Sequence, residues 1–419
     1  MRYFVQSWFS TPSNPIGVDF GSDCLRIAQT EQVNGEWRLA AAASADVPPH
    51  VRNEPHARFA FFGETIRELI SRGNFRGRRV TLCLPASMMY IQHLRLPKMD
   101  DEATKKALAW ELRGKIPFDP SAAVLRHVIA GEIYHDSEPK NEVIVMAARR
   151  DMVEQLLETA AKARLDVTGM NVEPRALVDC FARIYRRNVD IEAPMMFTDI
   201  GNVATRAVIV HRGQIRFARV IPIGGEHLSR AVADAMRIPL EEARVLRAAH
   251  AASALTEPEP APVKQVVQEP SDSRGESFAF LGLAPPAPSA TMQTAVAEAP
   301  PVAAPKIAAE TTIDTATHEP IARLTEELAL CRRYYEATFA NAPVQRLVFV
   351  GGEANQRGMC QQIARELGVA AQVGDPLVRM GKFTEIGVES GIDRRKPQPG
   401  WAVAIGLSMG AFNPEKPQD

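Results

Sequence analysis

The sequence predicts an α/β fold whose core consists of two related halves. Strand-like apolar runs alternate with runs of helical periodicity, a pattern typical of α/β proteins. One short motif occurs twice, at residues 16–26 and again at residues 197–206. A proline-rich stretch then interrupts the second half of the chain.

The expected elements follow from the period of their apolar residues. Strand-like runs lie at 80–84, 143–147, 197–199, 203–210 and 347–350, and helical runs lie at 61–71, 152–164, 177–185, 321–340 and 358–367.

The repeated motif reads Ile-Gly-Val-Asp-Phe-Gly-Ser-Asp-Cys-Leu-Arg in its first copy and Phe-Thr-Asp-Ile-Gly-Asn-Val-Ala-Thr-Arg in its second. Each copy is an apolar strand that ends in Asp-x-Gly, followed by small or polar residues and an arginine. A turn signal follows each copy, at Asn34 with Gly35 and at Arg212 with Gly213, and leads into a returning strand. The repeat predicts a duplicated fold with two facing hairpins.

Both turns have the chemistry of a phosphate-binding site. A glycine after the strand lets the backbone turn tightly, so that amide N–H groups can point at a phosphate. Asp19 and Asp199 would lie near the phosphates, where each can hold Mg²⁺ through water. A third element, residues 349–354, is a strand leading into Gly351 and Gly352 ahead of a helix, and such a turn lets an adenosine approach the backbone.

Each of these signals also has a simpler interpretation. An aspartate in such a turn forms Asx hydrogen bonds. Glu173, which precedes a proline, is equally a common helix start, and Gly224 with Gly225 either face phosphate or end a strand. The sequence contains neither Gly-x-x-x-x-Gly-Lys-Ser/Thr nor Gly-x-Gly-x-x-Gly, which argues against P-loop and Rossmann sites.

Composition argues against several classes of partner. Lys+Arg 49 against Asp+Glu 50 gives a formal net charge of -1, so no overall field attracts the chain to nucleic acid or to an anionic membrane. No apolar run is long enough to span a bilayer, and residues 1–13 are expected to form a flexible leader. The five cysteines show no metal-ligand or redox spacing, which suits a reducing, cytoplasmic location.

A small α/β module is expected to interrupt the first half at residues 87–166. Asp100 or its neighbour caps a helix that runs to about residue 114. The apolar residues of this helix form two stripes, one containing Trp110 and the other containing Leu108 and Leu112, so the helix must be covered twice. The second cover is either the module's own core or a partner.

The remaining boundaries follow from composition. Residues 251–310 are rich in Pro, Ala, Glu and Ser without a periodic apolar pattern, which predicts a disordered linker. The first domain is then expected at 14–86 and 167–193, and the second at 194–250 and 311–413.

These motifs resemble those of a known superfamily. The three glycine turns are similar, in their order, to the first phosphate, second phosphate and adenosine motifs of the actin-like superfamily, which has a ribonuclease-H-like fold. Val-Glu-Pro-Arg-Ala at 172–176 is similar to its connecting helix. Within the superfamily the chain resembles the PilM family, which is related to FtsA. The residues that carry this narrower resemblance are Leu-Pro-Lys-Met at 96–99, Trp-Glu at 110–111, Ile-Pro-Phe at 116–118, Glu327, Tyr-Tyr at 334–335 and the closing run 401–407.

The resemblance implies ATP and Mg²⁺ as cofactors, with slow ATPase activity at most. It implies that Asp19 and Asp199 serve the metal and that Glu173 positions an attacking water. The residues it implies for nucleotide binding are Asp19, Gly21, Ser22, Arg26, Asp199, Gly201, Asn202, Thr205, Gly224, Gly225, Glu327, Gly351, Gly352 and Glu353. The first turn departs from the superfamily pattern, because Asp23 and Arg26 stand where Ser, Thr and Lys are usual.

The resemblance also implies an adaptor in type IV pilus assembly. The inserted module would hold the N-terminal cytoplasmic tail of a PilN-like inner-membrane protein, through Leu108, Leu112, Ile116 and Phe118. Other pilus assembly proteins would be further partners, and the chain would reach the inner membrane only through its partner. The alternatives are a carbohydrate kinase of the same superfamily, an FtsA-like filament-forming protein and an adaptor of a related secretion system.

Overall fold

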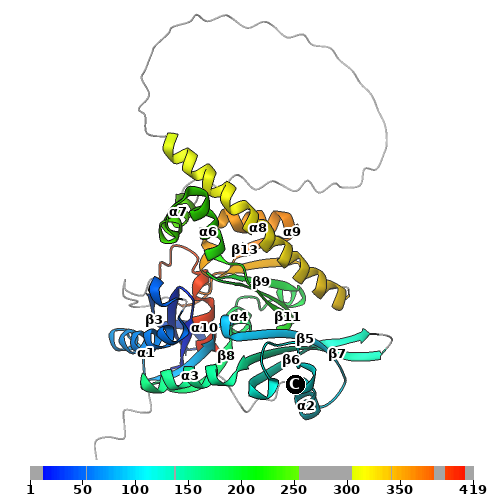
Figure 1. Ribbon diagram of the computed structural model, residues 1–419. Helices are drawn as coiled ribbons and strands as arrows, with labels where there is room; N and C mark the ends of the chain where they lie inside the picture. Colours follow the sequence, from blue (N-terminus) through cyan, green and yellow to red (C-terminus); the bar gives the residue numbers. More distant parts are fainter. Residues whose placement is uncertain are drawn as a thin grey trace, which may run out of the picture.

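The computed structural model describes residues 13–52, 54–135, 138–253, 304–340, 342–381 and 392–410. This part of the chain contains two five-stranded sheets and one three-stranded sheet. Figure 1 shows the two large sheets in separate halves of the molecule, with the small sheet beside the first. Residues 1–12 of the predicted leader and residues 254–303 of the predicted linker lie outside the described residues.

The first large sheet has the order β3-β2-β1-β4-β8. Its strands are β1 (Ile16–Phe20), β2 (Cys24–Val33), β3 (Glu36–Asp46), β4 (Arg79–Leu84) and β8 (Asp166–Val172). The first three strands are antiparallel neighbours, whereas β4 pairs in parallel with both β1 and β8.

The second large sheet repeats this arrangement in the order β11-β10-β9-β12-β13. Its strands are β9 (Met195–Ile200), β10 (Thr205–His211), β11 (Gln214–Ile221), β12 (Arg346–Val350) and β13 (Ala370–Val373). The antiparallel and parallel pairs match those of the first sheet strand by strand. The predicted α/β class and duplicated two-domain, actin-like architecture are therefore confirmed.

The two predicted turns close equivalent hairpins. Asn34 and Gly35 have φ of 52° and 82°, and Arg212 and Gly213 have φ of 54° and 71°. Two-residue hairpin loops of type I′ need positive φ at both positions, and glycine accepts such a φ without steric cost. Local sequence therefore determines where each hairpin reverses.

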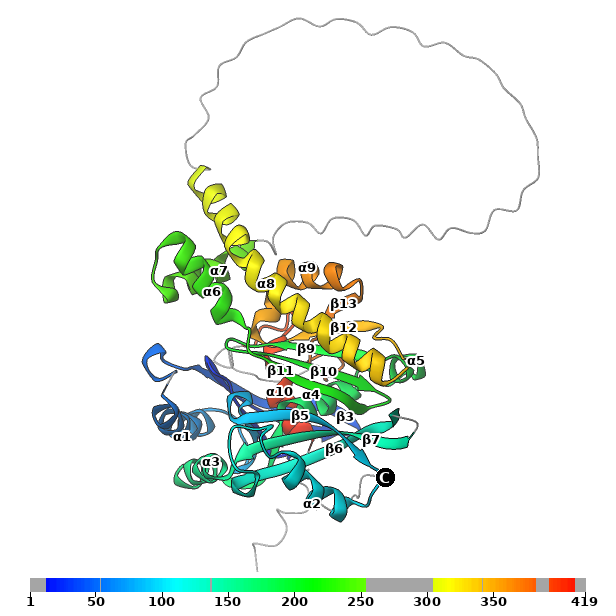
Figure 2. The same ribbon diagram turned by 45° about the vertical axis from the view of Figure 1, so that its right-hand side comes forward.

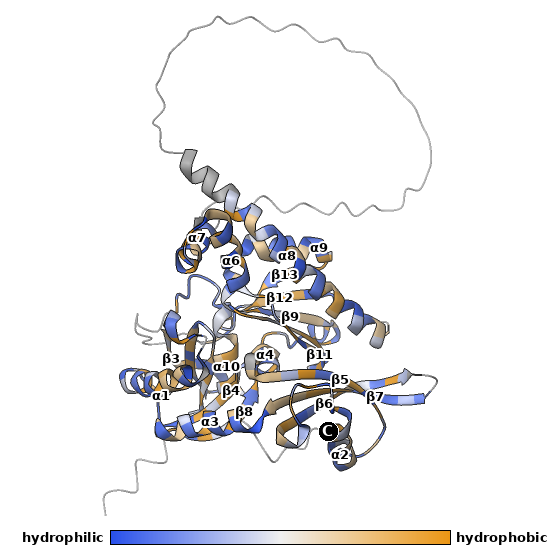
Figure 3. Ribbon diagram, viewed as in Figure 1, coloured by the Kyte–Doolittle hydropathy of each residue, from blue (hydrophilic) through white to orange (hydrophobic). Residues whose placement is uncertain are grey.

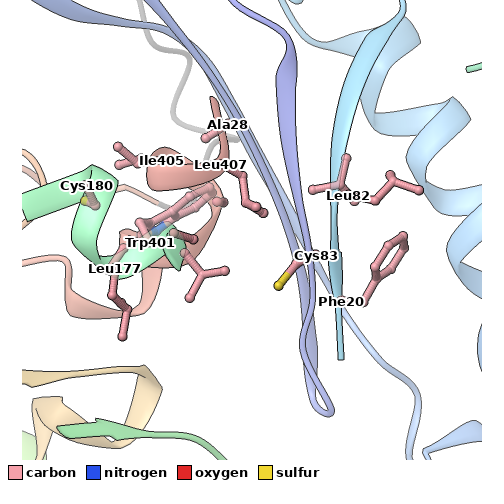
Figure 4. Close-up of a cluster of buried hydrophobic side chains, with 14 of the residues drawn as sticks. Phe20, Ala28, Leu82, Cys83, Leu177, Cys180, Trp401, Ile405 and Leu407 are labelled. Carbon is pink, nitrogen blue, oxygen red and sulfur yellow. The ribbon is translucent and has the colours of Figure 1, made fainter. Parts of the chain in front are cut away.

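Helices cover both faces of the first sheet. α1 (Pro55–Arg72) and α3 (Arg150–Lys162) lie together on one face, and α4 (Glu173–Ala182) and α10 (Ala402–Met409) lie on the other. In Figure 4 Phe20 and Leu82 point to one side of the sheet, and Cys83 points towards Leu177 and Trp401 on the other. Phe20 contacts Phe62 of α1, with their ring centroids 4.9 Å apart.

The last helix returns to the first half of the molecule. α10 packs on β1 and α4, although the predicted boundary assigned residues 311–413 to the second domain. Its residues from Ala402 to Ser408 are all buried, so a single polar face would be incompatible with its position. Two glycines allow this close approach: a Cβ on Gly17 of β1 would overlap the carbonyl of Ala404, and a Cβ on Gly406 would overlap the carbonyl of Ala176.

The second half carries α5 (Asn188–Glu192), α6 (Gly225–Met236), α7 (Leu240–Ser253), α8 (Ala304–Thr338) and α9 (Arg357–Leu367). α7 and α8 extend into the two ends of the predicted linker, where residues 251–253 and 304–310 are helical. These residues are rich in alanine, the strongest helix former, so the helices continue past their last periodic apolar residues.

The inserted module is a three-stranded sheet in the order β5-β7-β6, covered by one helix. It comprises β5 (Met89–Pro97), α2 (Asp101–Glu111), β6 (Ala123–His135) and β7 (Glu138–Arg149). Asp100 caps α2 by accepting a 2.7 Å hydrogen bond from the amide of Ala103. α3, which the prediction included in the module, packs on α1 in the first domain.

The module's core contains most of the residues that were expected to bind a partner. Leu108, Leu112 and Ile116 are buried against the module's own sheet, with Phe118 partly buried at the edge of the cluster. The other stripe of α2 faces outward, where Trp110 is 67% exposed. Leu108, Leu112 and Ile116 therefore serve the module's core and are not available for a partner.

The module also contacts the second domain through a polar network. His93 of β5 has its Nε2 3.1 Å from the carbonyl of Ala218 and its Nδ1 2.9 Å from Oε1 of Glu142. Tyr334 of α8 donates a 2.6 Å hydrogen bond to the same carboxylate, which is fully buried. Figure 2 shows β5 running next to β11, where this network forms.

The apolar character of the described helices is directed inward. In Figure 3 the strands and α10 are largely apolar, whereas α1, α3 and α7 alternate between apolar and polar residues.

All five cysteines are buried and free. Among the described helices, none is both long enough and apolar enough to cross a bilayer.

Two helical glycines provide a test of the α10–α4 contact. Gly406→Ala should lower the free energy of unfolding by several kcal/mol, because the new methyl group overlaps the backbone of α4 and overpacking costs about 1–3 kcal/mol or more. Gly358→Ala is the matched control: Gly358 is an exposed helical glycine with no atom near the Cβ position, so alanine should stabilise the protein by about 0.5–1 kcal/mol. Urea unfolding of both variants measures whether each substitution lowers or raises the free energy of unfolding. Equal effects would contradict the close approach.

Candidate functional site

A polar pocket with a volume of about 240 Å³ lies between the two domains, at the ends of β1 and β9. Both repeated turns line it, together with the turn after β12 and the segment before α10. The lining residues are Asp19, Gly21, Ser22, Asp23, Arg26, Glu173, Asp199, Gly201, Asn202, Val203, Ala204, Arg206, Gly351, Gly352, Glu353, Asn355, Pro399, Gly400, Ala402 and Val403.

The two turns place their charged residues in the same way. Asp19 of β1 is directly opposite Arg26 of β2, and Asp199 of β9 is directly opposite Arg206 of β10. Side chains directly opposite each other in an antiparallel pair lie on the same face of the sheet. The seven-residue spacing of the repeat therefore brings an aspartate and an arginine to the pocket from each domain.

Arg206 is fixed at the bottom of the pocket by two carboxylates. Its Nε and Nη2 donate to the two carboxylate oxygens of Glu173 at 3.0 and 2.5 Å, and its Nη1 lies 3.3 Å from Oδ2 of Asp199. Burial alone would lower the pKa of Arg206, but the attraction of Glu173 and Asp199 raises it. Each oxygen of Glu173 thus accepts a hydrogen bond from Arg206 and keeps a further lone pair, so the role of Glu173 in positioning an attacking water stays a prediction.

Arg26, the equivalent residue of the first domain, is differently placed. Within the described residues it makes no hydrogen bond or ion pair, although it lies against the pocket wall close to Gly400 and Gly352. Burial opposes its charge, while neighbouring Cys24 and Asp19 raise its pKa, so the guanidinium stays protonated. Arg26 is therefore a cation in the pocket whose donors remain available.

Asp19 is nearly buried beside this arginine. Burial raises its pKa from 3.8 to about 7; the attraction of Arg26 opposes this rise, and the repulsion of Glu173 adds to it. The carboxyl of Asp19 is consequently only partly ionised near neutral pH.

The backbone of each turn offers amide groups. The second turn is closed by a 3.0 Å hydrogen bond from the amide of Gly201 to the carbonyl of Ala204. The amides of Ser22 and Asn202, at corresponding places in the two turns, donate no hydrogen bond to another described residue. Uncommitted amides in glycine turns are the usual ligands of phosphate groups.

The third turn brings Gly351 against the second. Gly351 has φ of 88°, and a Cβ there would overlap the carboxylate of Asp199, so this position requires glycine. The turn continues into the short helix η4 (Gly352–Asn355). Glu353 lines the pocket and pairs with the buried Arg247 of α7 at 2.7 Å.

Most of the residues predicted for the nucleotide site line this pocket. These are Asp19, Gly21, Ser22, Arg26, Glu173, Asp199, Gly201, Asn202, Gly351, Gly352 and Glu353. The structure brings them together from four separate stretches of the chain.

Four predicted residues lie outside the pocket lining. Thr205 donates its hydroxyl to the carbonyl of Ile223 at 2.7 Å. Gly224 and Gly225 pack against the second turn from behind, where the amide of Gly225 donates to the carbonyl of Gly201. Glu327 lies on α8 and pairs with Arg219 at 2.9 Å. These residues support the site or the sheet and do not face the pocket.

Sequence reasoning missed one central residue. Arg206 has the same position in its motif as Arg26, but only Arg26 was assigned to the site. The repeat itself carried the signal. Pro399 and Gly400 were also missed, because their segment follows the second domain in sequence and has no motif of its own.

The pocket fits phosphate groups better than it fits a divalent cation. Two glycine turns with free amides and the unpaired Arg26 suit a polyanion. Mg²⁺ usually binds one or two carboxylates together with phosphates and water, and Glu173 and Asp199 are already paired with Arg206. No group of three or more Asp, Glu, His or Cys side chains among the described residues has the arrangement of a metal site.

The pKa of Asp19 predicts a pH-dependent stability. Between pH 3.8 and about 7 the carboxyl of Asp19 stays protonated in the folded chain and is ionised in the unfolded chain. The free energy of unfolding of the wild type therefore falls as the pH rises through this window. Asp19→Asn cannot ionise and avoids this loss. The free energy of unfolding of Asp19→Asn, relative to that of the wild type, should rise by at most about 4 kcal/mol from pH 4 to pH 8. Urea unfolding in EDTA at both pH values tests this, and a constant difference would contradict it.

Comparison with known proteins places the chain in a family. The family model for type IV pilus assembly protein PilM matches residues 17–255, more than half of the chain, and the model for cell division protein FtsA matches residues 196–406. No curated protein matched the sequence. Among solved structures, a PilM-PilN type IV pilus biogenesis complex is 20% identical, covers 96% of this chain and 99% of its own, and has a TM-score of 0.68. The ethanolamine utilization protein EutJ from Carboxydothermus hydrogenoformans is 14% identical, with coverage of 96% and 90% and a TM-score of 0.47. Because the PilM model matches more than half of the chain, the chain belongs to the PilM family of actin-like type IV pilus assembly proteins.

Proposed function

We propose that this chain is an ATP-binding adaptor that acts on the cytoplasmic side of the inner membrane in type IV pilus assembly. In this role it binds the N-terminal cytoplasmic tail of a PilN-like inner-membrane protein. Membership of the PilM family supports the pilus assignment. A similar fold occurs in a solved complex described as PilM-PilN, which supports the choice of partner.

The nucleotide assignment depends on one observation. Equivalent turns from the two domains face a single pocket, and each offers a free amide at Ser22 or Asn202. A polyphosphate held between them would contact both domains at once, so it would favour their closure. A ligand shifts such an equilibrium only by its greater affinity for the closed state.

The module is the proposed partner surface, with Phe118 kept from the expected contact residues and Tyr90 added to it. Phe118 is partly buried and packs edge-to-face against Tyr90, with the ring centroids 5.4 Å apart and Tyr90 38% exposed. This aromatic pair lies beside the buried cluster that contains Leu108. An apolar residue of a bound tail could pack on the pair without opening the module's core.

The same geometry weighs against a carbohydrate kinase. A kinase needs a carboxylate base beside its acceptor, and both Glu173 and Asp199 are paired with Arg206. The FtsA match over residues 196–406 leaves an FtsA-like filament as the second candidate. Nucleotide-dependent pelleting with filaments in electron micrographs would favour that candidate.

Filling the pocket should abolish nucleotide binding without unfolding the protein. Gly352 lines the pocket and is exposed, and only Arg26 lies near its Cβ position. Gly352→Leu should therefore weaken ATP binding at least about tenfold, since the side chain occupies space that a ligand needs. Gly358→Leu places the same side chain at an exposed position away from the pocket and is the control. Calorimetric titration with ATP measures both, and normal affinity in Gly352→Leu would refute this use of the pocket.

Partner binding should be separable from folding at the aromatic pair. Phe118→Asp should lower the melting temperature less than Leu108→Asp and abolish binding of a synthetic PilN-like N-terminal tail, because Phe118 is only partly buried at the edge of the module's core. Leu108→Asp should instead unfold the module, since burying a carboxylate without a partner costs several kcal/mol. Fluorescence anisotropy of a labelled tail and thermal melts separate the two effects. Normal tail binding by folded Phe118→Asp would place the partner elsewhere.

A further inference from the structure

We propose that Arg206 occupies the place of a divalent cation in this pocket, so that the chain binds nucleotide phosphates without a metal ion. This inference rests on the proposed nucleotide site and states how that site balances its charge. It departs from the Mg²⁺ that the superfamily resemblance implies.

The first step is the position of the guanidinium. Arg206 bridges Glu173, which begins α4 of the first domain, and Asp199, which ends β9 of the second. The side chain of Arg206 is 15% exposed and its two carboxylate partners are buried, so the arrangement is largely shielded from solvent. A cation between these two carboxylates would have to displace a guanidinium that cannot lose its proton.

The second step is the charge of the remaining acids. Glu353 is paired with Arg247, and Asp23 lies within the electrostatic reach of Arg58. Among the lining acids, the side chains of Asp19 and Asp23 form no ion pair with another described residue. These two carboxylates supply only part of the octahedral oxygen shell of Mg²⁺, so a metal ion here would be held chiefly by nucleotide phosphates and water.

The third step is what remains for an anion. Arg26 carries a positive charge into the pocket without an ion pair to any described residue, and it lies near the first turn and Gly352. Ser22 and Asn202, whose amides donate no hydrogen bond to another described residue, line the same pocket from opposite domains. A guanidinium with backbone amides is sufficient to hold a di- or triphosphate, because each makes charge-assisted hydrogen bonds to phosphate oxygens.

The decisive experiment compares nucleotide binding with and without metal. Wild-type protein is titrated calorimetrically with ATP, and separately with pyrophosphate, in excess EDTA and in excess Mg²⁺. The ATP dissociation constant should agree within about threefold between the two conditions. ATP binding that appears only with Mg²⁺ would overturn the metal-free inference and leave the nucleotide assignment standing. If neither ATP nor pyrophosphate binds in either condition, the nucleotide assignment is overturned as well.

Two variants test the roles of the two arginines. Arg26→Gln should weaken ATP and pyrophosphate binding at least about tenfold in both buffers, whereas Arg72→Gln, an exposed residue at the end of α1, should not. Arg206→Met leaves two buried carboxylates without their cation and should lower the melting temperature. Mg²⁺ should then restore part of this loss in Arg206→Met and have no effect on wild type. A wild-type melting temperature that rises with Mg²⁺ alone would show that the pocket already accepts the metal.

Discussion

The bridge from Arg206 to Glu173 and Asp199 is the interaction on which the organisation of this molecule depends. It joins the two domains at the base of their pocket, where water is largely excluded. Removing one partner from such a buried set leaves an uncompensated charge, at a cost of about 3–5 kcal/mol, even though the complete set adds little net stability. Its main effect is therefore specificity: the ends of α4 and β9 can adopt only the relative position in which one guanidinium reaches both carboxylates.

A second ion pair joins the two domains outside the pocket lining. Arg52, next to the short helix η1 (Pro49–Val51) of the first domain, pairs with Glu241 of α7 in the second domain at 2.8 Å. The same carboxylate lies 3.5 Å from Arg244, which donates to Asn202 in the second turn. A half-exposed pair of this kind contributes only about 0–1 kcal/mol. The domains are thus joined by one largely buried bridge and by one more exposed pair, and the exposed pair costs less to break.

Sequence predicted those features that short stretches of chain determine. The two hairpins follow from Asn34 with Gly35 and from their counterparts, and the repeated spacing of aspartate and arginine specifies the pocket ends. Features that depend on tertiary context were harder to predict. Two apolar stripes on α2 do not reveal which one faces the core, so Leu108 was assigned to a partner although it is buried. The sequence around Glu173 also does not indicate that an arginine of the other domain donates hydrogen bonds to both oxygens of its carboxylate.

The inserted module is connected to the pocket through the second domain. His93 and Glu142 tie the module to Ala218 of β11 and to Tyr334 of α8. β11 pairs along its length with β10, the strand that carries Arg206. A buried, hydrogen-bonded carboxylate such as Glu142 resists displacement, because any shift leaves its charge without partners. Movement of the module must therefore move β11 with it. The neighbouring strand β10 carries Arg206, whose guanidinium positions both domains.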